Sequence, residues 1–336
     1  MNTHDVNPVL VEIWRGPVLE SVHRGAVAVA ASDGALVEGW GDVERVILPR
    51  SAVKMIQALP LIESGAADAA GLSSREIALA CASHQGAAMH TTLAARWLDA
   101  IGRSEADLRC GAHPPGDAAA REALIRRGAS PSQLHNNCSG KHCGFVTVAW
   151  HLGAGPEYVD ASHPVQQAVR LAVEETGGAA VQGMAIDGCS APNFAVPLTA
   201  LATAMARFAH SDKALDGTRR AAARRIIAAM TAHPELVAGE GRAATRLMRA
   251  ARGRAVVKSG AEGVFTAILP GPGLGIALKI DDGAGRAAEA AMAALLVRYG
   301  VLDRRDPVIA AFTDVPLRNW RGIAHGRLRV APALLG

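Results

Sequence analysis

The spacing of hydrophobic and polar positions changes twice along the chain. Near both ends, short apolar or alternating runs bounded by Gly, Pro and Asp are typical of β-strands. From Ser51 onward the apolar positions instead recur with a helical period. The predicted strands are residues 9–14, 19–23, 26–31, 35–40, 45–48, 254–258, 264–269, 275–280 and 322–330. The predicted helices are residues 73–81, 90–101, 118–127, 139–152, 164–175, 198–209, 216–232 and 285–299.

Capping and turn residues agree with these boundaries. Asp33-Gly34 is hairpin-turn chemistry, because glycine accepts a positive φ. Ser73-x-x-Glu76 is a capping-box pattern, and Pro164 suits the first position of a helix. Strands at both ends with helices between them predict an α+β fold, a mainly antiparallel sheet flanked by helices, in a single domain over residues 1–336.

Composition indicates a globular protein with a core of small side chains. Half of the 336 residues are hydrophobic and 20% are charged, whereas aromatic residues make up only 4%. No run of about 18 apolar residues occurs, which argues against a membrane span. Residues 1–12 carry Asp5 and Glu12 and lack the basic start and apolar run of a secretory signal. We therefore expect a cytoplasmic protein, in which the five cysteines are free thiols or metal ligands rather than disulfides.

The formal net charge of +4 and the pI near 9.0 do not by themselves indicate nucleic-acid binding. The basic residues are scattered, and the cluster Arg219-Arg220 with Arg224-Arg225 is helical and mixed with alanine. No zinc-finger spacing or interleaving of aromatic and basic residues accompanies it. We interpret it as a solvated helix face and expect no nucleic-acid partner.

The lysines are more informative than the arginines. The chain has only five, Lys54, Lys141, Lys213, Lys258 and Lys279, against 30 arginines. Lysine can lose its proton when buried or placed near another cation and can then act as a base, whereas arginine stays protonated. A lysine retained in such a chain is a candidate for chemistry that arginine cannot perform.

Two of these lysines lie in serine-containing motifs. Ser51 and Lys54 form Ser-x-x-Lys at the predicted start of a helix, where one helical turn puts hydroxyl and amine on one face. Lys258-Ser259-Gly260 follows a predicted strand. These two motifs occur together in penicillin-recognising serine hydrolases. The alternatives are a capping serine with a surface lysine, and a strand-end lysine that faces water.

A third lysine lies in a cluster of possible metal ligands. Cys138, Lys141 and Cys143 fall at a predicted helix start, and Cys189 follows Asp187. Cysteine is a zinc ligand and lysine binds metal only when neutral, but the spacing matches no ordinary zinc site. On chemistry alone, the alternative is a tight turn with two buried cysteines that pack like hydrophobic residues.

Two further segments are less diagnostic. His84, in Cys81-Ala82-Ser83-His84, is either a binding residue or a satisfied core histidine. Glu240, in Gly239-Glu240-Gly241-Arg242, lies in a loop that either contacts substrate or is a simple turn.

These segments together, nearly from end to end, resemble the rhizobial-type L-asparaginases, the class 3 or thermolabile family. The matching stretches are Arg50-Ser51-Ala52-x-Lys54, Cys81-Ala82-Ser83-His84, Leu108-Arg109-Cys110-Gly111-x-His113-Pro114, Asn137-Cys138-Ser139-Gly140-Lys141-His142, Asp187-Gly188-Cys189, Val237-Ala238-Gly239-Glu240-Gly241-Arg242 and Lys258-x-Gly260-Ala261. One departure is Gln85, where the family pattern has a small hydroxyl residue.

The resemblance implies the fold of serine β-lactamases and serine glutaminases and a homodimer. It also implies two catalytic tandems and a metal site, usually described as zinc. The tandems are Ser51 with Lys54 and Ser83 with Lys258, and the metal ligands are Cys138, Lys141 and Cys189.

The expected reaction is hydrolysis of L-asparagine to L-aspartate and ammonia. Ser51 or Ser83 attacks the side-chain amide, and Ser51 is favoured for its position at a helix start. The expected substrate-binding residues are Arg50 for the α-carboxylate, Asp187 for the α-ammonium, and His84 and Glu240. Alternatives are a glutaminase or a penicillin-recognising hydrolase on the same fold, and a non-catalytic protein that binds a metal or an amino acid.

Overall fold

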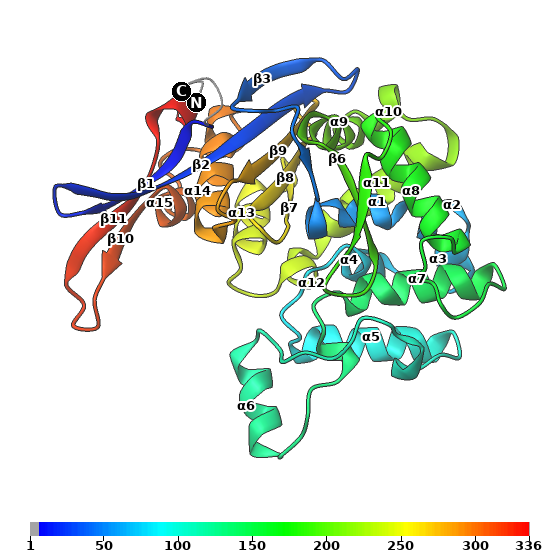
Figure 1. Ribbon diagram of the computed structural model, residues 1–336. Coiled ribbons are helices and arrows are strands. Elements are labelled where there is room, and N and C mark those ends of the chain that lie inside the picture. Colours follow the sequence, from blue (N-terminus) through cyan, green and yellow to red (C-terminus); the bar gives the residue numbers. More distant parts are fainter. Residues whose placement is uncertain (1–6, 336) are drawn as a thin grey trace. The chain divides into compact units, whose positions relative to one another are not determined.

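Strands lie near both ends of the chain and helices between them in the computed structural model, which describes residues 7–335 (Figure 1). The predicted α+β class is confirmed. Residues 1–6, which carry part of the argument against a secretory signal, lie outside the described residues.

The contacts divide the chain into two compact units. A sheet unit comprises residues up to 52, residues 196–210 and residues from 246 onward, and a helical unit comprises residues 53–195 and 211–245. Each unit is built from separated stretches, so neither boundary follows the order of the sequence. That residues 1–336 act as a single catalytic domain stays a prediction.

The sheet unit contains a sheet in the strand order β10-β11-β1-β2-β9-β8-β7, with β3 paired to β2, and every one of these pairs is antiparallel. The strands are β1 (Val9–Arg15), β2 (Val18–Ala31), β3 (Leu36–Trp40), β7 (Val256–Ser259), β8 (Val264–Leu269), β9 (Leu274–Ile280), β10 (Asp314–Arg318) and β11 (Ala324–Val330). The predicted antiparallel sheet is therefore present, with the first and last strands of the chain side by side.

Strand β2 is one strand of 14 residues where the hydrophobic pattern predicts two. Its first half pairs with β1 and its second half pairs with β3 and β9. Gly25 falls between the predicted halves, and a Cβ there would lie 2.4 Å from the carbonyl oxygen of Lys279. The glycine thus permits a close approach of β9 rather than ending the strand.

Helices packed on this sheet bury small side chains. Helix α9 (Leu198–Ala209) contacts β2, β8 and β9, and α14 (Gly285–Arg298) contacts β1, β8, β9 and β11. Alanines dominate the buried face of α14, as the composition predicts. The other elements that lie in or reach into this unit are β4 (Val46–Ile47), α13 (Ala243–Ala251), α15 (Pro307–Thr313) and η4 (Pro332–Leu334).

The helical unit is arranged around α7 (Ser139–His151), which contacts α2, α3, α4, α5 and α8. The remaining elements here are η1 (Arg50–Val53, at the boundary), α1 (Lys54–Gln57), α2 (Leu59–Glu63), α3 (Ala66–Ala69), α4 (Ser74–Ala80), α5 (Ala88–Ala100), η2 (Glu105–Asp107), α6 (Ala118–Arg126), η3 (Gln133–His135), α8 (Pro164–Gly177), β5 (Gly183–Ile186), β6 (Pro192–Pro197), α10 (Ser211–Ala214), α11 (Gly217–Ala232) and α12 (Pro234–Ala238). The capping box of Ser73 and Glu76 forms at α4, and Pro164 opens α8, as predicted.

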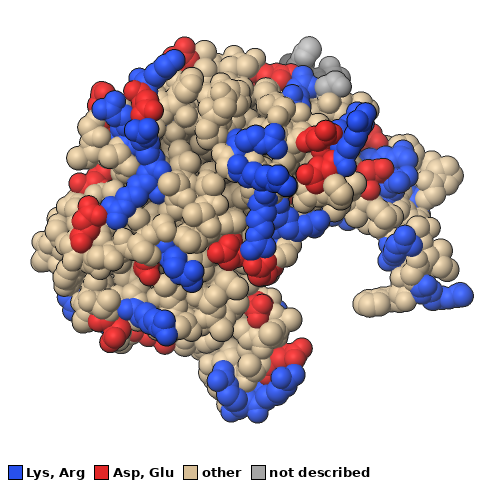
Figure 2. Space-filling view, turned by 180° about the vertical axis from the view of Figure 1, so that it is seen from behind, with Lys and Arg blue, Asp and Glu red and all other residues tan. Residues whose placement is uncertain are grey.

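Basic and acidic side chains lie close to one another over much of the face drawn in Figure 2. The predicted basic face of α11 is only partly solvated, because the side chain of Arg219 is 17% exposed and pairs with Glu63 at 2.7 Å. Arg225 on the same helix pairs with Asp68 at 2.5 Å. Among the described residues, no helix combines the length and the apolarity needed to cross a membrane.

Candidate active site

Ser51 lies in a tight turn of the sheet unit. It is half-buried in the 3-10 helix η1, and the amide of Ala52 donates to the carbonyl of Pro49 at 3.1 Å. Arg50, directly before it, has a φ of 53°, a left-handed conformation that costs a non-glycine residue about 1 kcal/mol. Such a conformation persists only where the surroundings fix it, and it is frequent at functional sites.

The end of β7 fixes this turn from one side. The hydroxyl of Thr266 lies 3.1 Å from the carbonyl oxygen of Ala52 and 3.3 Å from that of Lys258. A Cβ on Gly260 would lie 2.8 Å from the carbonyl oxygen of Pro49. The sheet unit therefore holds the backbone of Ser51 beside the Lys258 strand. Thr266 was not predicted from the sequence, although its hydroxyl in the otherwise apolar run of β8 is a usable signal, since buried hydroxyls need a hydrogen-bond partner.

Lys258 is buried, with a relative exposure of 1%. Its ammonium donates to the carbonyl of Ser259 at 2.7 Å. The alternative of a strand-end lysine that faces water therefore does not hold.

Lys54 is the first residue of α1 and is also 1% exposed. Its Nζ lies 3.1 Å from the Oγ of Ser83 and 3.1 Å from the Sγ of Cys138, and it also donates to the carbonyl of Ala82. The helical unit thus brings together Lys54 and Ser83, which the resemblance assigns to different tandems. The pairing of Ser83 with Lys258 stays a prediction.

The three predicted metal ligands converge in the helical unit. Cys138 caps α7, Lys141 lies in its first turn, and both are buried with Cys189. Lys141 Nζ lies 3.0 Å from Cys189 Sγ. A hydrogen bond joins the two sulfurs, and with the Lys54 and Lys141 cations it holds the pKa of Cys138 well below its usual range. The same bond, together with burial, raises the pKa of Cys189.

This donor set fits zinc. Burial alone would lower the pKa of the Lys141 ammonium. The two cysteine sulfurs have the larger effect, and the pKa is raised. Metal binding would have to displace that proton, and sulfur and nitrogen ligands of this kind suit Zn²⁺. No group of three His, Cys, Asp or Glu side chains among residues 7–335 could hold a metal. A metal bound by Cys138 and Cys189 would therefore need Lys141 as its third ligand.

Two of the other cysteines, Cys110 and Cys143, are poor nucleophiles. All five thiols are free and buried, as the sequence predicts for a chain without disulfides. Burial raises the pKa of Cys110 to about 12 and raises that of Cys143 as well. Neither thiol is therefore a candidate nucleophile.

His84 is buried, and both of its ring nitrogens are engaged. Nδ1 accepts from the amide of Gly86 at 3.0 Å, so Nε2 carries the hydrogen and donates to Ser139 Oγ at 2.9 Å. Burial and the neighbouring His90 lower the pKa of His84. His84 is therefore a core histidine with both ring nitrogens hydrogen-bonded. A hydrogen bond from His84 to substrate would have to replace one of these two bonds.

The other predicted substrate-binding residues are more accessible. Arg50 and Asp187 are half-buried, and Glu240 is exposed. Asp187 lies in the turn that carries Cys189, where its Oδ1 accepts from the amide of Gly188 at 2.7 Å. Its charge contributes to the raised pKa of Lys141, so Asp187 lies near the predicted metal ligands.

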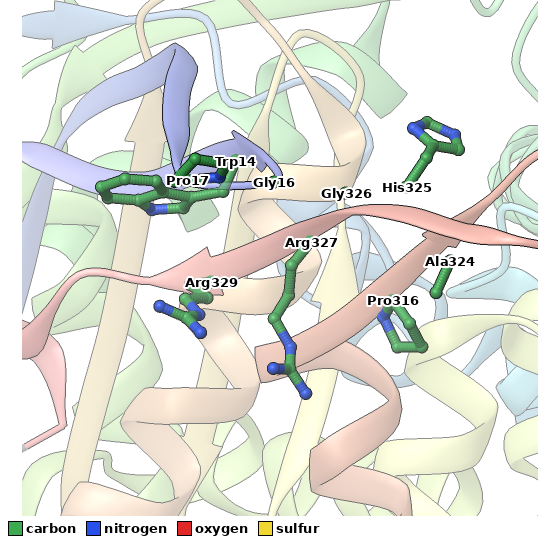
Figure 3. Close-up of a pocket in the computed structure, with 9 residues that line it drawn as sticks. All are labelled: Trp14, Gly16, Pro17, Pro316, Ala324, His325, Gly326, Arg327 and Arg329. Atoms are coloured by element: carbon green, nitrogen blue, oxygen red, sulfur yellow. The ribbon is translucent and has the colours of Figure 1, made fainter.

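A hollow of about 460 Å³ lies elsewhere in the sheet unit, beside β1 and β11 (Figure 3). Trp14 lies on one side of it, and Arg327 and Arg329 project from β11. Arg327 is already paired with Asp314 at 2.6 Å. None of the predicted catalytic residues lines this hollow, so it adds nothing to the candidate active site.

The fold and the Lys54–Ser83 contact define an α+β protein with a serine and a lysine within hydrogen-bond reach, the arrangement of hydrolases that act through an activated serine. The sequence model of the L-asparaginase II family matches residues 11–330, so the chain belongs to the L-asparaginase II family. It is accordingly a hydrolase that acts on an amide, as the sequence predicts.

Comparison with other known proteins adds little to this assignment. No curated protein matches the chain. Among solved structures, the chain is similar to a β-lactamase from Mycobacterium bovis, with 14% identity over 82% of this chain and 94% of that one and a TM-score of 0.46. It is also similar to a protein described as a β-lactamase from Bacteroides dorei, with 10% identity over 76% and 84% and a TM-score of 0.42.

Proposed function

We propose that the chain hydrolyses L-asparagine through an acyl-enzyme on Ser51, with Lys54 as general base. The observation that carries the proposal is the buried Lys54 with its Nζ 3.1 Å from Ser83 Oγ, in a member of the L-asparaginase II family. Lys54, at the end of the Ser-x-x-Lys motif, acts in its neutral form and takes the Ser51 proton as the hydroxyl attacks the amide carbon. Ser83, hydrogen-bonded to Lys54, relays that proton from Lys54 to the departing ammonia, which restores the neutral amine of Lys54.

The other predicted residues bind the substrate and the developing charge. Lys258 supplies a fixed positive charge to the oxyanion, an interaction of the kind typically worth about 3 kcal/mol. Arg50 and Asp187 bind the α-carboxylate and the α-ammonium of the amino acid, and Glu240 and His84 complete the pocket. Water then hydrolyses the acyl-enzyme on Ser51.

The first experiment is an ammonia-release assay with L-asparagine and L-glutamine for the wild type, Ser51→Ala and Ser83→Ala. We expect hydrolysis of asparagine by the wild type and its loss in both variants, with an aspartyl adduct detected by intact mass only where Ser51 is present. An adduct that survives Ser51→Ala would move the nucleophile to Ser83. No ammonia from either amide with zinc supplied would contradict the proposal, and cleavage of nitrocefin would then favour a penicillin-recognising hydrolase.

We further propose that Cys138, Lys141 and Cys189 hold a zinc ion. When bound, the ion would neutralise the sulfur charge and fix the start of α7; Ser51 and Lys54 would still carry the hydrolysis. We expect the metal to raise the melting temperature of the wild type and not that of Cys189→Ser, with Cys110→Ser as the matched control. An unchanged melting temperature and less than about 0.1 zinc per chain in the purified protein would contradict the site.

The oligomeric state and the cellular location are proposed from the family resemblance alone. We propose a cytoplasmic homodimer. Light scattering coupled to size exclusion measures the mass directly, and a mass of one chain across the concentration range would contradict the dimer.

A further inference from the structure

Three consecutive residues around Ser83 are tied to three different parts of the helical unit. The amide of Ser83 donates to the carbonyl of Val237 at 2.8 Å, and that of His84 donates to the carbonyl of Asn137 at 3.2 Å. The carbonyl of Gln85 accepts from the amide of Asp117 at 2.9 Å. The position of Ser83 therefore depends on the end of α12 as well as on its own segment.

The side chain of Gln85 lies directly on the backbone of Gly239, the residue that follows α12. A Cβ on Gly239 would lie 2.3 Å from Gln85 Oε1 and 2.8 Å from its Cδ. On Gly116 a Cβ would lie 3.7 Å from Gln85 Cβ. Gln85 thus packs against two glycines, and at Gly239 any side chain would collide with its amide group.

Gly239 is held from a second direction as well. The buried hydroxyl of Thr245 donates to the carbonyl of Gly239 at 2.6 Å. Gly239 has a φ of 110°, which favours glycine. Val237, whose carbonyl holds Ser83, lies just before this point, and the exposed Glu240 lies just after it.

We propose that Gln85 is a positioning and selectivity-determining residue, whose side chain holds the segment 237–241, the end of α12 and the turn after it, and so sets the spacing between Ser83 and Glu240. The inference rests on the proposed function for its substrate. Removing the side chain would leave the carbonyl of Gly239 with its bonds from the Thr245 hydroxyl and, at 3.4 Å, from the amide of Arg242. With that packing lost, the segment 237–241 could move away from Ser83. A wider pocket would bind asparagine less tightly and discriminate less against the longer glutamine.

The test compares Gln85→Ala, which empties the space, with Gln85→Met, which fills it without the amide. Gln167→Ala is the matched control, because Gln167 is exposed on α8 and its side chain bonds only locally, to the carbonyl of Ala161. For Gln85→Ala we expect a KM for asparagine raised about tenfold and a kcat within about twofold, since loosened substrate positioning weakens binding. The ratio of kcat/KM for asparagine to kcat/KM for glutamine should fall about fivefold. That loss is smaller than the discrimination that a pocket typically achieves between substrates that differ by one methylene.

Hydrogen exchange of the backbone amides in residues 237–241 provides a readout that needs no activity. We expect exchange about tenfold faster in Gln85→Ala and wild-type exchange in Gln85→Met and Gln167→Ala. Unchanged exchange in Gln85→Ala, a lower melting temperature with unchanged KM, or a Gln85→Met variant that behaves like Gln85→Ala would each overturn the proposal. If the wild type released no ammonia from asparagine, the proposed function would fail, and exchange alone would decide the role of Gln85.

Discussion

At the scale of single residues, Lys54 stands out because a long basic side chain is almost fully buried among neutral or sulfur partners. Its Nζ contacts Ser83, Cys138 and the carbonyl of Ala82. Burying a lysine is costly unless its nitrogen is hydrogen-bonded, and such lysines are concentrated at sites of proton transfer.

Replacing Lys54 with methionine should abolish turnover and preserve the fold. Methionine fills a similar volume but cannot take a proton, so we expect kcat to fall at least about a thousandfold. Ammonia release measures the loss, circular dichroism checks the fold, and Lys213→Met, at an exposed position, serves as the control. A Lys54→Met variant that kept a tenth of wild-type kcat would rule out Lys54 as the base.

The stacked pair His84 and His90 makes stability depend on pH. Their ring centroids lie 4.7 Å apart with planes 9° from parallel. Burial lowers the pKa of both, the like charges of Lys54, His113 and His135 lower that of His84 further, and Glu235 and Asp117 partly offset the shift at His90. Because the folded pKa values lie below the unfolded value, the unfolded chain binds more protons in acid.

The free energy of unfolding should therefore be unaffected by these histidines above about pH 6.5 and fall below it. Each of the two contributes a slope of up to about 1.4 kcal/mol per pH unit. Urea unfolding at pH 7.5, 6.0 and 5.0 measures the slope for the wild type and for His84→Gln. Equal slopes in the two proteins would show that His84 is not a source of acid sensitivity.

The residues of the site could be selected from the sequence, but their contacts could not. The Ser-x-x-Lys motif selected Ser51 and Lys54 because both lie within one helical turn. The Lys54–Ser83 contact and the bridge from Thr266 to Ala52 join residues far apart in the chain. No periodicity or capping rule encodes such tertiary contacts.

At the scale of elements, capping and turn residues predicted element boundaries correctly where a side chain bonds to backbone a few residues away. The capping box at Ser73 formed as predicted. By contrast, β5 and β6 escaped prediction, since β6 begins and ends with proline and β5 is only four residues long. The gap expected inside β2 was wrong, because the backbone of β9 occupies the space beside Gly25.

Helix α9 approaches β9 closely enough that Gly275 has no space for a side chain. A Cβ there would lie 2.1 Å from the carbonyl oxygen of Ala202 and 2.2 Å from the amide of Ala206. Gly275→Ala should lower the free energy of unfolding by about 3 kcal/mol, because rigid backbone must move. Urea unfolding tests this against Gly271→Ala, whose Cβ would meet nothing within 4 Å. Equal stabilities in the two variants would contradict the packing argument.

At the scale of the whole molecule, the sheet unit depends on both ends of the chain. Strand β1 pairs on one side with β2 and on the other with β11, with Val11 opposite Val330. The C-terminal strands β10 and β11 therefore complete a sheet whose other members come partly from the first 40 residues and partly from residues 256–280.

Truncation before β11 should prevent this unit from folding. A chain ending at residue 323 leaves β1 with an unpaired edge and uncovers part of α14, and exposed edges of this kind promote aggregation. We expect loss of soluble protein, or a melting temperature at least about 10 °C below the full chain. Solubility and thermal unfolding measure the effect, and a truncated chain with the full-length melting temperature would contradict it.

The pairing of β1 with β11 also constrains how a cell can make this protein. A ribosome adding about 5–20 residues per second exposes β1 first and must synthesise nearly the whole chain before its partner appears, a delay on the order of tens of seconds. During that interval the nascent sheet edge is open to other chains. Expression yield should therefore respond to chaperones that shelter the emerging N-terminal strands.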